Sequence, residues 1–316
     1  MKLNKNNFEV LSFVATSKEK LSQRKISKAL NISVGTVNKI VTELIDDNYL
    51  VYNNSNIEIT DNGLEVLEPY RVKRAILLAA GFGSRMRPVT LNTPKPLVLV
   101  HGKRIIETIL DALIAADITE IYIVRGYLGE QFNVLKDKYP TITLIDNPIY
   151  NETNNISSAY LVRDKFQNAL VMEADLLIHN PSIIKKYHYN SYYTGRFVDV
   201  TDDWCFEVKN GYISKLKIGG ENVYHTYCIA YFSEEDGKKM EKDIEASFEL
   251  PGAREKVWDY VALDYFKEHY KISVREVLKS DIDEIDTFNE LKKIDKTYDI
   301  WKVVRLKFQN KGFPLF

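Results

Sequence analysis

The first 70 positions alternate apolar and polar residues with the period of a helix. Apolar side chains recur three or four residues apart and predict three short amphipathic helices, within residues 8–14, 21–30 and 37–45. Asn31-Ile32-Ser33 forms a tight turn before the third helix, and Ser33 can cap that helix. Two short runs, residues 49–52 and 57–60, flank a turn of four small polar residues and predict a hairpin.

From residue 71 onward, apolar runs typical of strands alternate with segments typical of helices. These segments are residues 72–80, 105–116, 121–124, 130–138 and 142–145. Such alternation predicts an α/β fold, a Rossmann-like and mostly parallel mixed sheet covered by helices. We therefore divide the chain into a small helical domain, residues 1–70, a large α/β domain, residues 71–300, and a tail, residues 301–316, for which the sequence predicts no role.

Composition narrows the classes of function. The 43 Lys and Arg residues nearly balance the 44 Asp and Glu residues, so the whole molecule has no general attraction for nucleic acid or membrane surfaces. Cys205 and Cys228 are too few for a disulfide framework and lack the spacing of metal ligands. The N-terminus lacks the apolar core of a signal peptide, and no run of about 18 uncharged apolar residues occurs. We expect a cytoplasmic protein without membrane insertion.

Charge is distributed unevenly in the small domain. Residues 1–42 carry eight Lys and Arg against two Glu, and residues 43–70 carry acids only. The helix spacing and hairpin resemble a winged helix-turn-helix domain, and the resemblance implies that Ser33, Thr36, Asn38 and Lys39 begin a helix that enters the major groove of DNA. The predicted hairpin carries no Lys or Arg, and winged helices also serve as dimerisation modules. DNA and a second copy in a homodimer therefore remain alternative partners.

The stretch from Ala75 to Leu97 is the most informative part of the large domain. An apolar strand opens into Gly81-Phe82-Gly83-Ser84, and Arg85 and Lys95 bring positive charge to the same place, which predicts a phosphate-binding loop. A Walker loop is excluded because no Gly-Lys-Ser/Thr follows the glycines. The dinucleotide motif G-x-G-x-x-G is excluded because Met86 occupies its third glycine position.

The whole run from Leu78 to Leu97 resembles the signature of the nucleoside-triphosphate transferases. The two glycines, Arg85, Pro88-Val89-Thr90 and Pro94-Lys95 stand in register with it, and the resemblance continues to Glu284-Ile285-Asp286-Thr287. It implies that Arg85 and Lys95 are the catalytic cations that act on the phosphates. It also implies that the loop backbone binds the nucleotide, through Ala79, Ala80, Gly81, Gly83 and Ser84.

A metal site is also expected. Residues 169–175 form an apolar run that ends in an acid, and a carboxylate at the carboxyl end of a strand beside a polyphosphate is a usual ligand of Mg²⁺. The resemblance points to Asp175 as the main ligand of Mg²⁺ and to Asp259 as the second, while Glu173 is expected on the other sheet face in a structural role. The implied chemistry is in-line attack of a substrate phosphate on the α-phosphorus of the nucleotide, without a covalent intermediate.

Two further segments bear on the substrates. Residues 147–161 resemble the base-binding segment of bacterial CTP:phosphocholine cytidylyltransferases, which implies that Asn154, Asn155 and Ser158 read cytosine; Asn155 or Ser157 could instead cap the helix that follows. Tryptophan faces attract a quaternary ammonium. Candidates for a choline-binding cage, two of them matching tryptophans of that subfamily, are Trp204, Trp258, Tyr227 and Tyr260. Taken singly, however, each aromatic residue is more often part of a core.

These observations predict a Mg²⁺-dependent cytidylyltransferase that converts CTP and phosphocholine into CDP-choline and pyrophosphate. One alternative keeps the reaction but uses another small phosphorylated or phosphonate amine, such as 2-aminoethylphosphonate, for which Asp202 and Asp203 would suit the amine, or a sugar 1-phosphate. A second alternative is a transcriptional regulator that senses a nucleotide or a choline metabolite without turnover.

Overall fold

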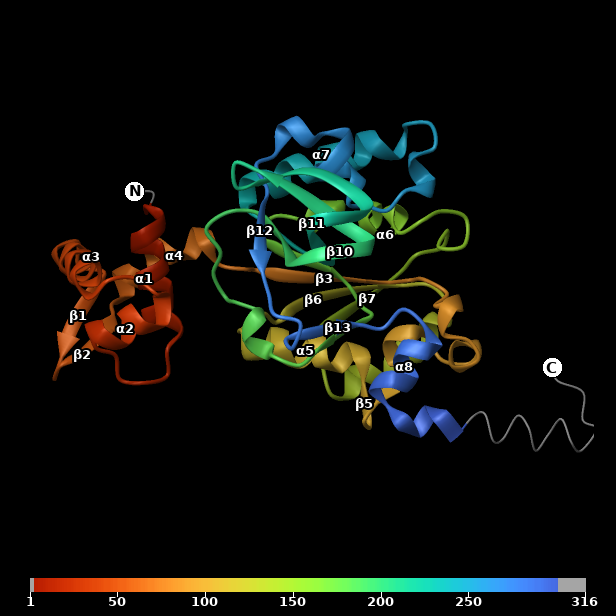
Figure 1. Ribbon diagram of the computed structural model, residues 1–316, viewed down its shortest axis with the longest axis horizontal. Helices are drawn as coiled ribbons and strands as arrows, with labels where there is room; N and C mark the ends of the chain where they lie inside the picture. Colours follow the sequence, from red (N-terminus) through yellow and green to blue (C-terminus); the bar gives the residue numbers. More distant parts are fainter. Residues whose placement is uncertain (1–2, 301–316) are drawn as a thin grey trace, which may run out of the picture. The chain divides into compact units, whose positions relative to one another are not determined.

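The computed structural model describes residues 3–300, which form two compact units (Figure 1). The first unit consists of the chain up to Val72 together with Lys185–Asn190, and the second consists of Lys73–Ile184 and the chain from Ser191 onward. The predicted domain boundary at residue 70 lies just before the division after Val72. The predicted tail, residues 301–316, lies outside the described residues.

The first unit is a winged helix-turn-helix fold, as predicted. Its elements are α1 (Lys5–Thr16), α2 (Gln23–Leu30), α3 (Val34–Asp46), β1 (Leu50–Asn53), β2 (Asn56–Ile59) and α4 (Asp61–Leu67). Ser33 caps α3, because its hydroxyl accepts a hydrogen bond from the backbone amide of Thr36 (3.1 Å). The apolar faces of the helices close one core in which Leu11, Val37 and Leu44 are fully buried.

Residues 185–190 complete this core from a distant part of the sequence. Tyr187 is buried in the core, and the ring of Tyr189 stacks on the ring of Tyr70, with centroids 5.6 Å apart and planes 7° apart. The hydroxyl of Tyr189 donates to the carbonyl of Leu3 (2.8 Å). The winged-helix unit is therefore made from two separate stretches of chain, which the sequence pattern did not predict.

The second unit is built on a seven-stranded sheet with the strand order β12-β10-β11-β8-β3-β6-β7. Its strands are β3 (Arg74–Ala79), β6 (Glu120–Arg125), β7 (Ile142–Asp146), β8 (Ala169–Glu173), β10 (Tyr192–Lys209), β11 (Tyr212–Phe232) and β12 (Ser273–Glu276). Strand β3 lies between β8 and β6 and is parallel to both, and β7 is parallel to β6, whereas β11 is antiparallel to β8 and β10. This arrangement confirms the predicted mostly parallel mixed sheet.

Helices cover both faces of this sheet (Figure 1). Helices α6 (Ile156–Leu161) and α7 (Glu234–Phe248) lie over one face, and α5 (Ile105–Ala115) lies over the other. Strand β3 is apolar along almost its whole length because a central strand covered on both faces has no side toward water. Its Ile76 belongs to the same core as Met240 and Ile244 of α7.

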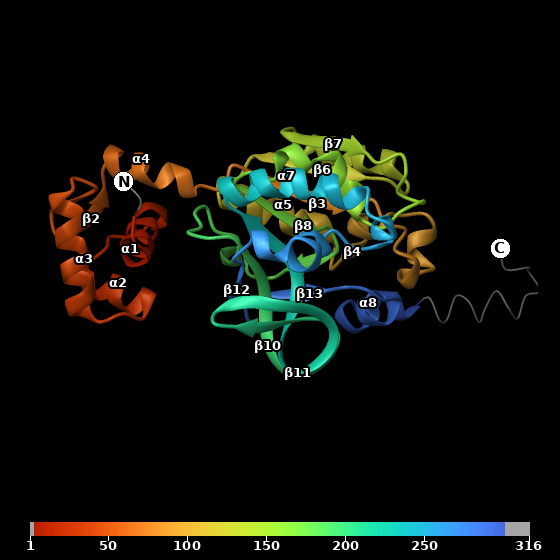
Figure 2. The same cartoon turned by 90° about the horizontal axis from the view of Figure 1, so that it is seen from above.

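Smaller elements surround the sheet. The antiparallel pairs are β4 (Leu99–Val100) with β5 (Lys103–Arg104) and β9 (Leu176–Ile178) with β13 (Ile282–Glu284), and α8 (Phe288–Ile294) follows β13. Strands β10 and β11 form one long curved hairpin (Figure 2). Because β9 begins one residue after Asp175 and pairs with β13, the chain around Glu284 is brought to the end of β8. None of the helices within residues 3–300 combines the length and apolarity needed to cross a membrane.

Candidate active site

The glycine loop follows β3 and takes a conformation that larger residues resist. Gly83 has a φ of +59°, and a Cβ atom on it would lie 2.8 Å from the Cβ of Lys95. The carbonyl of Gly83 accepts hydrogen bonds from the amide of Met86 (2.9 Å) and the hydroxyl of Thr90 (2.8 Å). Glycine therefore allows both the left-handed turn and the close approach of the loop to Lys95.

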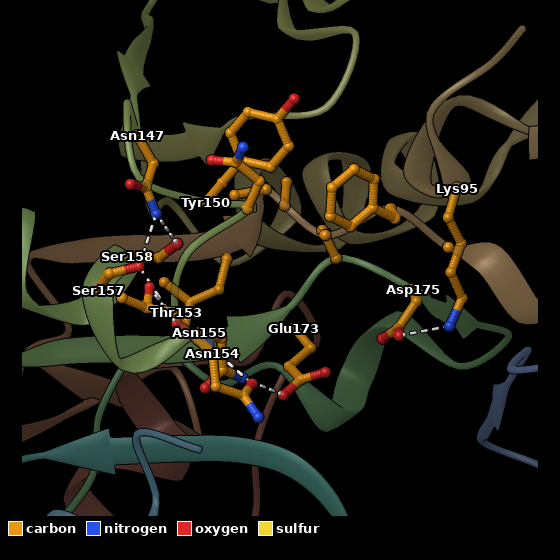
Figure 3. A pocket seen from close by; sticks show the side chains of 18 of the residues that line it. Lys95, Asn147, Tyr150, Thr153, Asn154, Asn155, Ser157, Ser158, Glu173 and Asp175 are labelled. Atoms are coloured by element: carbon orange, nitrogen blue, oxygen red, sulfur yellow. Dashed lines mark hydrogen bonds and ion pairs between the residues drawn. The ribbon is translucent and has the colours of Figure 1, made fainter. Parts of the chain in front are cut away.

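Lys95 is the centre of a chain of ion pairs. Its Nζ pairs with Oδ2 of Asp175 at 2.7 Å, an ion pair drawn as a dashed line in Figure 3, and lies 2.8 Å from Oδ1 of Asp286. Nη2 of Arg85 lies 2.8 Å from the same oxygen of Asp286. Burial by itself lowers the pKa of Lys95, but Asp175 and Asp286 outweigh burial and raise it overall, so the ammonium group stays charged.

Asp286 is positioned by the capping box of α8. The hydroxyl of Thr287 accepts from the amide of Glu290 (3.2 Å), and the carboxylate of Glu290 accepts from the amides of Asp286 (2.9 Å) and Thr287 (2.7 Å). The Thr-x-x-Glu sequence of residues 287–290 is therefore the local reason why the chain turns at Asp286 and directs it toward Lys95.

A cavity of about 550 Å³ lies at the carboxyl ends of β3 and β8 (Figure 3). The residues predicted to bind the nucleotide all line it: Ala79, Ala80, Gly81, Gly83, Ser84, Asn154, Asn155 and Ser158. Arg85, Lys95 and Asp175 line it as well. Neighbouring parallel strands end at the same edge of a sheet, which is why these segments, distant in sequence, meet in one cavity.

Hydrogen bonds hold the asparagine-rich segment of this cavity in place. Nδ2 of Asn147 donates to the hydroxyls of Ser157 (2.9 Å) and Ser158 (3.0 Å), as Figure 3 shows. Asn155 stands just before α6, but its side chain bonds to other segments: Nδ2 donates to Oε1 of Glu173 (2.9 Å), and Oδ1 accepts from the amide of Trp258 (2.9 Å). The side chain of Asn155 therefore joins three parts of the chain rather than capping the helix.

A second cavity, of about 250 Å³, adjoins the first. The residues that line both are Arg85, Asn154, Asn155, Glu173 and Asp286. Those that line the second alone are Asp203, Trp204, Phe206, Leu216, Thr226, Cys228, Val257, Asp259 and Glu284. The walls thus carry five acidic side chains against the single cation of Arg85, which suits a positively charged ligand.

Burial raises the pKa of several of these acids and so favours their uncharged form. Desolvation raises the pKa of Asp259, which is 5% exposed, to about 7. Desolvation also raises the pKa of Glu173 and of Glu284, and the negative charge of Asp175 adds to both shifts. Within residues 3–300, Oδ1 of Asp259 has no hydrogen bond of ordinary geometry, but the hydroxyl of Tyr193 lies close enough to offset part of the rise in the pKa of Asp259. Such carboxyl groups gain charge when a cation binds beside them.

The structure places the two predicted tryptophans in different environments. Trp204 lines the second cavity, and Tyr260 meets it edge to face behind that wall, with ring centroids 6.0 Å apart. Trp258 has no exposed surface, and its indole packs on Tyr193 with centroids 5.8 Å apart and planes 21° apart. Asp259 points into the cavity while its neighbour Trp258 points into the core, so one tryptophan face is available where a pair was predicted.

Tyr227 lies away from the cavity. Thr226 and Cys228 on either side of it line the cavity, and alternation along β11 turns the intervening side chain to the other face. There the ring of Tyr227 meets His225 edge to face, with centroids 5.2 Å apart, and its hydroxyl accepts from Nε of Arg196 (3.3 Å).

Two groups of side chains could hold a cation, one made of three acids and the other of two acids and a cysteine. Asp175, Glu284 and Asp286 make one group, and Glu173, Cys228 and Asp259 make the other; within each, the ligand atoms lie within 4.8 Å of one another. The predicted ligands Asp175 and Asp259 therefore fall in separate groups. The first group fits Mg²⁺, because its ligands are carboxylate oxygens and because Oδ1 of Asp175 is buried without a hydrogen-bond partner among the described residues. The second group includes a thiol, which Mg²⁺ does not favour.

Comparisons with known proteins agree with this geometry. The family model described as nucleotidyl transferase matches residues 74–195, and one described as winged helix-turn-helix DNA-binding matches residues 3–51. A 2-aminoethylphosphonate cytidylyltransferase from Lancefieldella rimae is 37% identical over 228 residues, which cover 71% of this chain and 92% of that protein. The chain belongs to the cytidylyltransferases of the nucleotidyl transferase family.

A relative and a solved structure named for phosphocholine are similar over the same region. A choline-phosphate cytidylyltransferase from Streptococcus pneumoniae is 30% identical over 224 residues, 71% of this chain and 97% of that protein. The solved structure of a CTP:phosphocholine cytidylyltransferase from Streptococcus pneumoniae superposes with a TM-score of 0.65 and 31% identity, covering 72% of this chain and 99% of that chain. The second unit of this cytidylyltransferase therefore has the family fold over nearly its whole described length.

Some residues of this cytidylyltransferase site were not expected from the sequence. Glu173 was placed on the opposite face of the sheet, but β8 ends at Glu173 and the chain turns at residues 174–175, so strand alternation does not separate the two acids, and Glu173 and Asp175 both line the first cavity. Asp286 was given no role, although the capping box that follows it marks a sharp turn at that position. Cys228 has a φ of +50°, which is uncommon for a residue with a side chain and has no signal in the sequence.

Proposed function

We propose that this cytidylyltransferase transfers the cytidylyl group of CTP to a small phosphonate or phosphate that carries a primary amine, of the 2-aminoethylphosphonate class. The observation that carries the proposal is the second cavity, in which five acids accompany a single tryptophan. A primary ammonium has three N–H donors that need acceptors, whereas a quaternary ammonium has none and is best held by aromatic faces. The relative from Lancefieldella rimae, named for 2-aminoethylphosphonate, supports the same acceptor.

The ammonium of the acceptor would lie against Asp259 and Glu284. Oδ1 of Asp259 is buried without a hydrogen bond of ordinary geometry among the described residues, although the hydroxyl of Tyr193 lies close enough to lower the pKa of Asp259, so a bound N–H donor would add the charged partner that this oxygen lacks. The phosphonate would then lie at the border of the two cavities, where Arg85 and Asn155 line both.

The reaction needs positioning and charge neutralisation rather than a protein nucleophile. An oxygen of the acceptor attacks the α-phosphorus of CTP, the new P–O bond forms as the bond to the β-phosphate oxygen breaks, and pyrophosphate leaves. Arg85 and Lys95 would neutralise charge on the phosphates. We propose Asp175 and Asp286 as ligands of Mg²⁺, which when bound supplies further positive charge beside the reacting phosphate.

Pyrophosphate release tests the proposal directly. With CTP, we expect 2-aminoethylphosphonate and phosphoethanolamine to react faster than phosphocholine, and glucose 1-phosphate not to react. Faster reaction with phosphocholine would show that the acceptor is phosphocholine, although only one tryptophan lines the cavity. Reaction with the sugar phosphate alone would contradict both amine assignments. Binding of CTP without release of pyrophosphate from it, whichever acceptor is added, would favour a sensor.

DNA binding is a second candidate function, favoured by one face of the winged-helix unit. Nδ2 of Asn38 on α3 donates to Oε1 of Gln23 on α2 (3.1 Å), and Nε2 of Gln23 donates to the hydroxyl of Tyr52 on β1 (2.7 Å). Exposed basic side chains lie on the same two helices, including Arg24 and Lys39. Proteins that recognise DNA use cationic side chains to contact the phosphates and side-chain amides to contact the edges of the bases, and this face offers both.

A salt titration tests this activity. Fluorescence anisotropy with DNA from the protein's own operon should show binding that weakens with salt, and Lys39→Ala should weaken it and reduce the slope of log K against log salt by about 0.9. Lys136→Ala, an exposed lysine of the other unit, is the control. Absence of binding at low salt would leave dimerisation as the role of this unit, which sedimentation of the full chain would detect.

A further inference from the structure

Lys95 occupies the space between the two carboxylates that we assign to Mg²⁺. Its Nζ lies 2.7 Å from Asp175 and 2.8 Å from Asp286. The side chain of Lys95 is 11% exposed, whereas that of Arg85, which also reaches Asp286, is 67% exposed. Solvent screens an exposed ion pair far more than a buried one. Lys95 therefore supplies most of the positive charge that balances these two acids.

We propose that Lys95 acts as a placeholder for the metal ion. In the protein without nucleotide, its ammonium holds Asp175 and Asp286 together and keeps divalent cations from binding there. When CTP occupies the nucleotide cavity, the ammonium moves to the phosphates and frees both carboxylates. This inference rests on the proposed function, because it takes Asp175 and Asp286 as the metal ligands.

The surroundings of Lys95 allow this exchange without movement of the backbone. The close approach of Gly83 confines the Cβ of Lys95, so the base of the side chain is fixed. Beyond it, the flexible four-carbon stem of a lysine lets the ammonium travel several ångströms. Lys95 lines the same cavity as the glycine loop, so the phosphates bound there lie within its reach.

Electrostatic repulsion prevents the ammonium of Lys95 and a divalent metal ion from occupying this place at the same time. Each carboxylate gives one oxygen to the ammonium, and a divalent ion coordinated by the same pair would lie only a few ångströms from a buried positive charge. Phosphates remove this conflict because they bind both cations. The metal should therefore bind together with CTP or after it, and only weakly before it.

The proposed role of Lys95 is tested by measuring the binding of Mn²⁺ to the full chain with electron paramagnetic resonance. Without nucleotide, we expect Lys95→Gln to bind Mn²⁺ at least tenfold more tightly than the unchanged protein, a difference of about 1.4 kcal/mol. Lys95→Arg keeps the charge and should bind as weakly as the unchanged protein. Lys103→Gln removes a lysine that pairs with Asp111 (2.6 Å) outside both cavities and should change nothing.

Addition of a CTP analogue with a methylene group between the α- and β-phosphorus should strengthen Mn²⁺ binding by the unchanged protein and remove most of its difference from Lys95→Gln. Equal or weaker Mn²⁺ binding by Lys95→Gln without nucleotide would overturn the placeholder, and Lys95→Met must give the same answer if the glutamine variant does not fold. Asp175→Asn separates the two claims. If it binds Mn²⁺ with the analogue as the unchanged protein does, the metal assignment of the proposed function fails; if it loses that binding, the assignment stands whatever Lys95 does.

Discussion

The backbone amide of Trp258 donates to the side-chain oxygen of Asn155, with 2.9 Å between nitrogen and oxygen, and the amide group of Asn155 donates in turn to Glu173 (2.9 Å). One side chain thereby ties the segment that carries Asp259 to the end of β8. Because Asn155 and Glu173 line both cavities, this pair of hydrogen bonds fixes the position of one cavity relative to the other, and in the proposed function it would set the distance between CTP and the acceptor.

Asn155→Ala should therefore impair both catalysis and stability. It leaves an amide of Trp258 and a buried carboxyl of Glu173 unpaired, and each lost bond costs about 1–3 kcal/mol. We expect the kcat/KM for cytidylyl transfer to fall by roughly 10- to 100-fold. Asn133→Ala, which removes a hydrogen bond to Arg125 outside both cavities, should leave the rate nearly unchanged. Equal rates for the two variants would contradict the linking role of Asn155.

The pH dependence of acceptor binding should follow Asp259. Its pKa is raised to about 7 by burial, so the carboxyl is largely neutral at pH 6 and charged at pH 8, while a primary ammonium stays protonated over this range. The KM for 2-aminoethylphosphonate should fall as the pH rises from about 6 to about 8. Asp259→Asn should raise the KM at pH 8 and flatten the part of the profile that belongs to Asp259; an unchanged profile would remove Asp259 from the ammonium site.

The raised pKa of Asp259 has the opposite effect on stability: a rise in pH that favours acceptor binding lowers the stability of the fold. The folded protein holds the proton of Asp259 more tightly than the unfolded chain, whose carboxyl has the ordinary pKa of 3.8. This contribution is fully present below pH 3.8 and is lost as the pH rises to about 7. In the proposed function, Asp259 would therefore favour acceptor binding at the pH at which it opposes folding, a trade-off common at functional sites.

Some parts of the site could be predicted from the sequence and others could not. The glycine loop and Asp175 were predictable because each belongs to a continuous segment whose backbone fixes its residues together. Asp286 meets Lys95 only through the pairing of β13 with β9, a contact between distant segments that no local pattern encodes. Trp258 was assigned to a cage because it matches a tryptophan of the phosphocholine subfamily beside the expected metal ligand Asp259, but adjacent residues face opposite ways, and its large apolar ring is better buried.

The close approach of the glycine loop to Lys95 predicts a difference between two glycines. Gly83 and Gly102 both have positive φ angles, +59° and +82°, but a Cβ atom would lie 2.8 Å from Lys95 at Gly83, whereas within the described chain no heavy atom lies within 4 Å of it at Gly102. Alanine costs about 1–2 kcal/mol of backbone strain at either position. Gly83→Ala should in addition displace Lys95 and lower kcat on the order of 100-fold. If both variants lose only stability, as measured by thermal unfolding, the contact with Lys95 has no catalytic importance.

Tyr189 should stabilise the winged-helix unit although it lies more than a hundred residues after Val72, where the first stretch of that unit ends. Tyr189→Ala removes the stacking on Tyr70 and the hydrogen bond to the carbonyl of Leu3, at a cost of about 1–3 kcal/mol, whereas Tyr189→Phe removes only the hydrogen bond and should cost about 1 kcal/mol. Hydrogen exchange of the full chain should show faster exchange in residues 3–72 for the alanine variant, while the strands β3, β6 and β8 keep their protection. Tyr212→Ala, at an exposed tyrosine of the β10–β11 hairpin, is the control. Unchanged exchange in residues 3–72 would show that the unit is stable without the side chain of Tyr189.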